Sequence, residues 1–110
     1  MNLAQIKEIV STYQKYEWKL RVFLLDEESH TQIRSELEDL YKTVEIRLAK
    51  IDAAWFSRPS KHDREAWELR ALSEPPYALI ETFANDQSEA SRTIVRNEME
   101  KRLAESGRKK

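Results

Sequence analysis

The sequence predicts an α+β fold in which helices pack on one largely antiparallel sheet. Apolar residues recur at helical spacing near both ends of the chain, whereas the middle alternates apolar and polar residues with the period of a strand. Short polar or proline-containing segments separate the alternating stretches, which favours antiparallel neighbours. The expected order is helix, strand, helix, a three-strand antiparallel meander and a C-terminal helix.

Length and composition bound the organisation of the chain. Its 110 residues are 40% hydrophobic and 35% charged, and they include one glycine and three prolines. With so few of the residues that are typical of linkers, the chain is predicted to form a single domain over residues 1–106, followed by a frayed basic tail over residues 107–110. There is no cysteine, which excludes disulfides and thiolate metal sites. We expect a cytoplasmic protein, since no apolar run reaches membrane-spanning length.

The first half of the chain is expected to form two helices around a strand. Residues 2–17 have the apolar spacing of an amphipathic helix, and residues 18–25 then alternate as a strand does. Ser29 and Gln32 have capping-box spacing, so the next helix is expected to begin at Ser29. One face of the predicted strand carries Trp18, Leu20, Val22 and Leu24.

The end of this second helix has two interpretations. Apolar residues keep a helical period as far as Trp55, with no glycine or proline before Pro59. The same stretch also alternates like a strand, and its β-branched residues cluster around Val44. We favour a break near Lys42 and a second strand over residues 44–58. The alternative is a mostly helical domain with a long central helix and a small hairpin.

The second half is expected to complete the meander and end in a helix. Strands are predicted over residues 65–72 and 77–83, separated by a turn at residues 74–76, where two prolines stand together. The last helix is expected over residues 86–106, capped by Asp86 or, alternatively, by Ser88. Its expected buried stripe contains Ile94, Val95, Met99 and Leu103, whereas Arg92 and Arg96 are expected to face water.

The segment AWFSRPSKHDREAW contains the candidate site residues. If its two ends pair as a hairpin, Trp55 and Trp67 lie nearly opposite each other, as a core pair or as part of an exposed site. Arginines near aromatic rings can bind carboxylate or phosphate, and His62 lies among carboxylates in the turn. The candidate ligand- or partner-binding residues are therefore Trp55, Arg58, His62, Arg64, Trp67 and Arg70.

Three functions fit these features. The leading hypothesis is a non-enzymatic protein-interaction module that binds a protein partner or itself. The alternative is a domain that binds a small anionic ligand through an arginine and aromatic surface. The third is an enzyme that uses His62 with a neighbouring carboxylate. The single glycine excludes the common phosphate-binding loops, and the two histidines, His30 and His62, lie in different elements without metal-ligand spacing. No catalytic residue, metal or cofactor is therefore assigned. The net charge of −1 argues against nucleic-acid and membrane partners.

Overall fold

The computed structural model describes residues 2–73 and 76–108. Three helices and one five-stranded sheet account for most of them, which confirms the predicted α+β class. The elements are, in chain order, α1 (Leu3–Lys15), β1 (Lys19–Leu25), α2 (Glu27–Leu40), β2 (Glu45–Leu48), β3 (Ala53–Ser60), β4 (Arg64–Ala71), β5 (Ala78–Ala84) and α3 (Glu89–Arg108).

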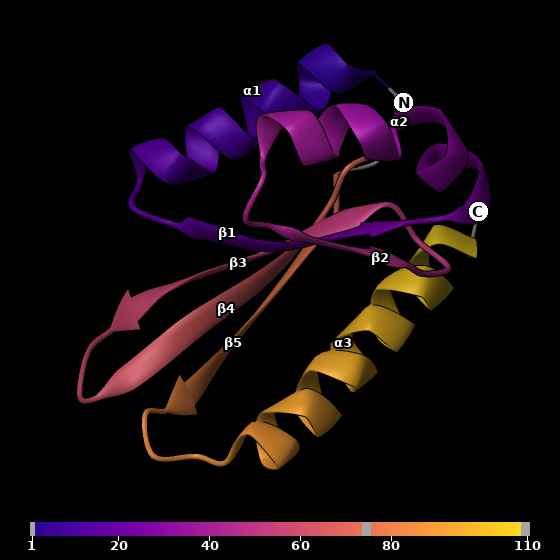
Figure 1. The fold of residues 1–110 in the computed structure, drawn as a ribbon. Helices are drawn as coiled ribbons and strands as arrows, with labels where there is room; N and C mark the ends of the chain where they lie inside the picture. Colours follow the sequence, from indigo (N-terminus) through magenta and orange to yellow (C-terminus); the bar gives the residue numbers. More distant parts are fainter. Residues whose placement is uncertain (1, 74–75, 109–110) are drawn as a thin grey trace.

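The sheet separates two unequal layers of helix. Its strand order is β2-β1-β3-β4-β5, with β1 and β2 parallel and every other neighbouring pair antiparallel. Helices α1 and α2 lie on one face and α3 lies on the other (Figure 1). The predicted meander is β3, β4 and β5. The two faces are called below the α1 face and the α3 face.

The predicted strand over residues 44–58 is two strands, and the long central helix is excluded. Edge strand β2 runs parallel to β1, because α2 returns the chain to the same end of the sheet as a βαβ unit does. The chain then turns at Asp52 and enters the central strand β3. The carboxylate of Asp52 accepts hydrogen bonds from the amide of Asp26 at 2.9 Å and the hydroxyl of Ser29 at 3.0 Å. These bonds tie the turn to the start of α2.

The two capping predictions need correction. Helix α2 begins at Glu27 with Asp26 as its N-cap, and the Asp26 side chain accepts the amide of Ser29 at 2.9 Å. The predicted cap Ser29 is instead buried against Asp52. For α3 the predicted alternative holds, because Ser88 Oγ accepts the amide of Ser91 at 3.1 Å. Asp86 lies outside the helix.

A β-bulge in β1 breaks the predicted alternation. Leu20 pairs with Phe56 and Val22 with Trp55, so Arg21 is the additional residue. As a result, Leu20 and Phe23, three residues apart, both belong to the core under α1 and α2. Val22 points instead toward the core under α3.

The central strand β3 supplies both hydrophobic cores. Phe56 faces the α1 face, where Ile6 and Val10 of α1 and Leu37 of α2 pack on the sheet. Trp55 faces the α3 face with Trp67, Phe83 and the α3 residues Met99 and Leu103. Both neighbouring aromatic residues of β3 are therefore buried, one in each core.

Two arginines of α3 pack against the sheet, where the sequence predicted only apolar residues. Ile94, expected in the buried stripe, is 71% exposed. Arg92 and Arg96, expected to face water, lie against the sheet, with their guanidinium groups 5.5 Å from the ring centre of Phe83 and 4.5 Å from that of Trp67, respectively. An arginine stem is long and apolar enough to cover a core when its charged end finds a partner.

Each tryptophan under α3 donates its indole N–H to a glutamate that also binds an arginine. Trp55 Nε1 lies 2.8 Å from Glu100, which accepts from Arg47 at 2.7 Å. Trp67 Nε1 lies 2.6 Å from Glu65, which accepts from Arg92 at 2.7 Å. Burial alone would raise the pKa of Glu65, but these bonds outweigh it and leave that pKa lowered.

Parts of two predictions lie outside the described residues, namely the proline turn at 74–75 and the end of the basic tail at 109–110. Helix α3 itself continues to Arg108, so it includes the first two residues of the predicted tail. Among the described helices, none has both the length and the apolar character needed to cross a membrane.

The burial of Trp55 predicts a large loss of stability on truncation. Its side chain is 1% exposed, so Trp55→Ala should lower the free energy of unfolding by about 3–5 kcal/mol in urea denaturation. The exposed Ile94 is the matched control, and Ile94→Ala should change it by less than about 0.5 kcal/mol. Equal unfolding curves for Trp55→Ala and the unchanged protein would contradict the packing described above.

Candidate functional site

The six predicted site residues do not share one surface. Trp55 and Trp67 lie on the α3 face and are 1% and 6% exposed, so neither ring is available to a ligand. They are diagonal neighbours rather than opposite, since Trp55 pairs with Leu69 and Trp67 with Ser57. Their ring centres lie 6.0 Å apart in an edge-to-face arrangement. Here the tryptophans belong to the core.

The three predicted arginines lie together on the α1 face. Every second residue of a strand points to the same face of the sheet, so Arg64, Ala66 and Arg70 of β4 share one face. Arg58 of β3 lies opposite Ala66 and therefore points to that face as well. Trp67 points to the other face, so the alternation within β4 could already have separated it from these arginines in the sequence. We call the surface formed by Arg58, Arg64, Arg70, Ile80 and Thr82 the arginine face.

Each of these arginines is held by a carbonyl oxygen rather than by a carboxylate. Arg58 donates to the carbonyl of Tyr16 at 2.8 Å and lies 4.8 Å from the ring centre of Trp18. Arg64 donates to the carbonyl of Thr82 at 3.0 Å and to its hydroxyl at 3.1 Å. Arg70 donates to the carbonyl of Ala71. Within the described residues none of the three forms an ion pair.

The two faces of the sheet therefore differ in whether their arginines form ion pairs. On the α3 face, Arg47, Arg92 and Arg96 each form an ion pair with a glutamate. On the arginine face, Glu68 accepts a hydrogen bond from the hydroxyl of Tyr13. Glu8 of α1 lines the same cleft as Arg70 without forming an ion pair with it. A guanidinium has five N–H groups, so each arginine there keeps donors for another acceptor. This surface is suited to binding carboxylates or phosphates.

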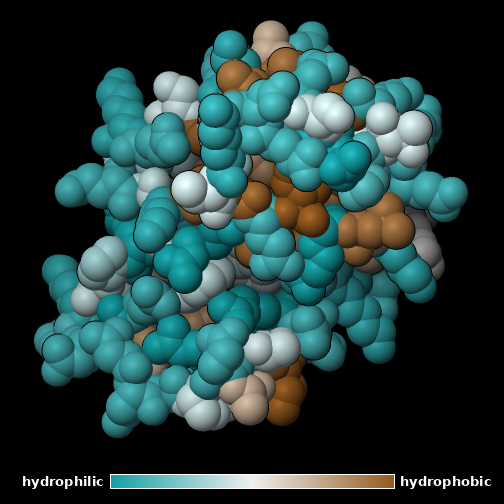
Figure 2. Space-filling model, in the orientation of Figure 1, coloured by the Kyte–Doolittle hydropathy of each residue, from teal (hydrophilic) through white to brown (hydrophobic). Residues whose placement is uncertain are grey.

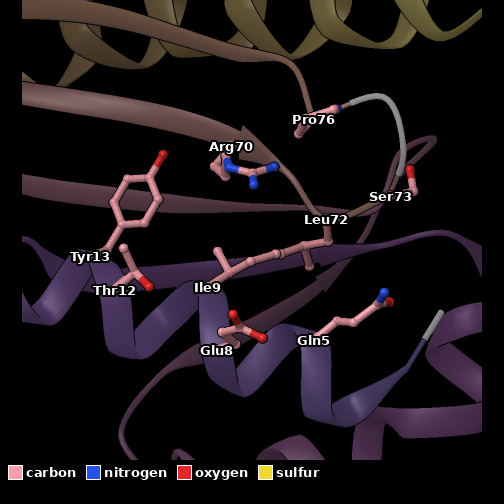
Figure 3. Close-up of a pocket in the computed structure, with 9 residues that line it drawn as sticks. All are labelled: Gln5, Glu8, Ile9, Thr12, Tyr13, Arg70, Leu72, Ser73 and Pro76. Carbon is pink, nitrogen blue, oxygen red and sulfur yellow. The ribbon is translucent and has the colours of Figure 1, made fainter.

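A cleft of about 440 Å³ opens beside Arg70, between α1 and the end of β4. Figure 3 shows the guanidinium of Arg70 extending into this space across from the side chains of α1. The lining is both polar and apolar and comprises Gln5, Glu8, Ile9, Thr12, Tyr13, Arg70, Leu72, Ser73 and Pro76. The sequence did not indicate this cleft, because α1 and β4 are about 55 residues apart, as in the Tyr13–Glu68 hydrogen bond.

Arg64 and Arg70 are too widely spaced to hold one small ion together. Arg64 and Arg70 are six positions apart along β4, which corresponds to about 20 Å at roughly 3.3 Å per residue. An extended chain with acidic residues can reach both. A single small anion can reach one of them.

His62 lies apart from this surface, at the tip of the loop between β3 and β4. It is exposed, and both His62 and Asp63 have left-handed backbone conformations, with φ of 61° and 56°. This places the imidazole on a solvated hairpin tip without an enclosing cavity of the kind general-base chemistry needs. Among the described residues, no group of three or more histidine and acidic side chains is placed to bind a metal.

A second cleft, of about 470 Å³, lies between the β2–β3 turn and α3. Its apolar lining includes Leu48, which is largely exposed, and Ile51. Figure 2 shows a mainly hydrophilic surface on which apolar atoms gather in a band between α2 and α3. Its charged lining residues have both signs, with Arg47, Lys50 and Lys101 beside Glu100 and Glu105, so it indicates no ligand class.

Comparison of the chain with protein-family models, curated proteins and solved structures finds no match. A function must therefore be inferred from the residues of this chain.

The Tyr13–Glu68 hydrogen bond predicts a loss of stability in alkali. Burial raises the pKa of Tyr13, and the Glu68 carboxylate raises it further. The folded chain thus keeps Tyr13 protonated at a pH where the unfolded chain releases the proton, at about 10. This contribution is complete below pH ~10 and is lost as the pH rises above it.

Urea unfolding of the unchanged protein and Tyr13→Phe across this pH range tests the hydrogen bond. At neutral pH the variant should be less stable by roughly 1 kcal/mol, because Glu68 loses a donor. Above pH ~10 the gap should shrink, since the variant has no phenol to ionise at this position. A gap that stays constant with pH would contradict the raised pKa.

Proposed function

We propose that this chain is a non-enzymatic protein-interaction module that binds an acidic, extended segment of a partner protein on the arginine face. One observation carries the proposal, namely three arginines on one face without a carboxylate partner among the described residues. Their spacing favours an extended ligand over a small ion. The absence of cysteine is compatible with the cytoplasmic location that we propose with it.

The composition of the arginine face supports a protein partner. Ile80 is 59% exposed among these arginines. Arginine is enriched at protein interfaces, where it supplies bidentate contacts and exposed apolar side chains supply buried area. The net charge of −1 gives the whole molecule no basic field that would favour nucleic acid.

Binding of a labelled polyglutamate peptide of about ten residues, measured by fluorescence anisotropy, tests the proposal. Replacing Arg58, Arg64 and Arg70 together by Gln should weaken binding by roughly tenfold or more, since each charge contributes up to about 1 kcal/mol. Added salt should weaken binding to the unchanged protein through screening.

The control variant removes three cations elsewhere, with Gln at Arg34, Lys101 and Arg102. It has the same net charge as the test variant but retains the arginine face. Equal loss of binding in the two variants would show that only net charge matters and would overturn the proposal. Failure of the unchanged protein to bind the peptide would overturn it as well.

The cleft beside Arg70 favours a second candidate function, the binding of a small carboxylate. Succinate at millimolar concentration should then raise the melting temperature, because a ligand that binds only the folded state stabilises it. Arg70→Gln should abolish this rise, whereas Arg64→Gln, which lies outside the cleft, should leave it. No succinate-dependent rise, or one that survives Arg70→Gln, would exclude this candidate.

A further inference from the structure

Strand β5 is an outer strand of the sheet, and only part of its free edge is covered. The carbonyl of Tyr77 accepts the amide of Ala71 at 2.8 Å, so Tyr77 faces β4. Alternation along an antiparallel ladder then turns the backbone groups of Ala78, Ile80 and Thr82 outward, away from β4.

Side chains cover the second half of this edge. The outward carbonyl of Thr82 accepts from Arg64 at 3.0 Å, and its outward amide donates to Glu81 at 3.2 Å. The next outward carbonyl, that of Ala84, accepts from Arg92 at 2.8 Å. Such contacts are one way in which proteins block an edge strand against pairing.

The first half of the edge has no such cover among the described residues. Ala78 is exposed and Ile80 is 59% exposed, and no side chain bonds to the outward amide or carbonyl of either. Four backbone groups thus remain free at one end of β5. Ala78 pairs with Arg70 of β4, so these groups lie next to the cleft and at one end of the arginine face.

We infer that the partner segment adds to β5 as a sixth, antiparallel strand, with an apolar residue facing Ile80 and an acidic residue two positions to either side. This inference rests on the proposed function and specifies how the acidic segment binds. In this register the central residue exchanges both backbone hydrogen bonds with Ile80. The two acidic side chains lie on the arginine face opposite Thr82, where Arg64 ends, and opposite Ala78, beside Arg70.

A peptide containing Glu-Val-Val-Val-Glu with blocked ends is the probe, and amide hydrogen exchange measured by NMR is the readout. The amides of Ala78 and Ile80 should exchange rapidly in the free protein and about tenfold or more slowly at saturating peptide. The matched control peptide has proline at its centre, which removes the amide that pairs with Ile80, and it should give no protection.

A variant pair tests the same edge from the protein side. Ala78→Pro removes an outward amide at the first residue of β5, where proline leaves the β4–β5 ladder intact. It should weaken binding of the probe severalfold. Ala90→Pro, in the first turn of α3, introduces the same residue away from the edge and should leave binding unchanged.

The remaining outcomes separate the two proposals. If the probe or polyglutamate binds and binding depends on the three arginines, but Ala78 and Ile80 stay unprotected, strand addition is wrong and the proposed function stands. If neither peptide binds, both are overturned. If these amides are already protected in the free protein and sedimentation shows a dimer, the edge pairs with a second copy, and the partner strand proposed here is wrong.

Discussion

Two buried indole N–H groups determine how α3 sits on the sheet. A buried donor without an acceptor costs roughly 1–3 kcal/mol, so Trp55 and Trp67 can be buried only where acceptors reach them. Glu100 reaches Trp55 from α3, while Glu65 of β4 reaches Trp67 and is bound in turn by Arg92 of α3. Since both sets of bonds cross between helix and sheet, they fix the rotation of α3 as well as its position. Arg47 and Arg92, which bind these same two glutamates, thereby have their charges compensated.

The other face differs because its helices cover the sheet unequally. Helix α2 packs over β1 and β2, and α1 packs over β1 and reaches Glu68 of β4 through Tyr13. No described helix packs on that face over β5. The arginines there extend over a solvated surface and bind carbonyl oxygens, which satisfy donors without neutralising charge. Within the described residues, folding therefore pairs Arg47, Arg92 and Arg96 with glutamates and leaves Arg58, Arg64 and Arg70 without a carboxylate partner.

Periodicity in the sequence was enough to predict the elements but not how they meet. Apolar spacing located all three helices, alternation located β1 and β4, and an apolar run bounded by turn residues located β5. Strands β2 and β3 were predicted as one strand. The hydrogen bond that holds the turn between them joins Asp52 to Asp26, 26 residues away in sequence. The bulge at Arg21 depends on its pairing with Trp55, which no local pattern shows.

The candidate site was predictable in part for the same reason. Arg58, Arg64 and Arg70 were selected from the sequence, and the parity of β4 places two of them on one face. The sequence could not show that Glu68, their near neighbour, is engaged by Tyr13. It also could not show that Arg92 and Arg96 bind glutamates and become partly buried, whereas the other three arginines bind no carboxylate of the described residues. Such differences arise from contacts between distant segments, which charge patterns in one chain do not specify.

The dependence of the tryptophan core on α3 also bears on the order in which the chain is made. The chain is synthesised from its N-terminus, and a domain generally folds as a unit. The strands that carry Trp55 and Trp67 leave the ribosome before the helix that covers them, since the bond from Trp55 to Glu100 joins positions 45 residues apart. During that interval the two indole rings lack the helix that buries them in the folded protein, and they are accessible to other chains and to chaperones. Because α3 is synthesised last, these rings can be covered only after its synthesis is complete.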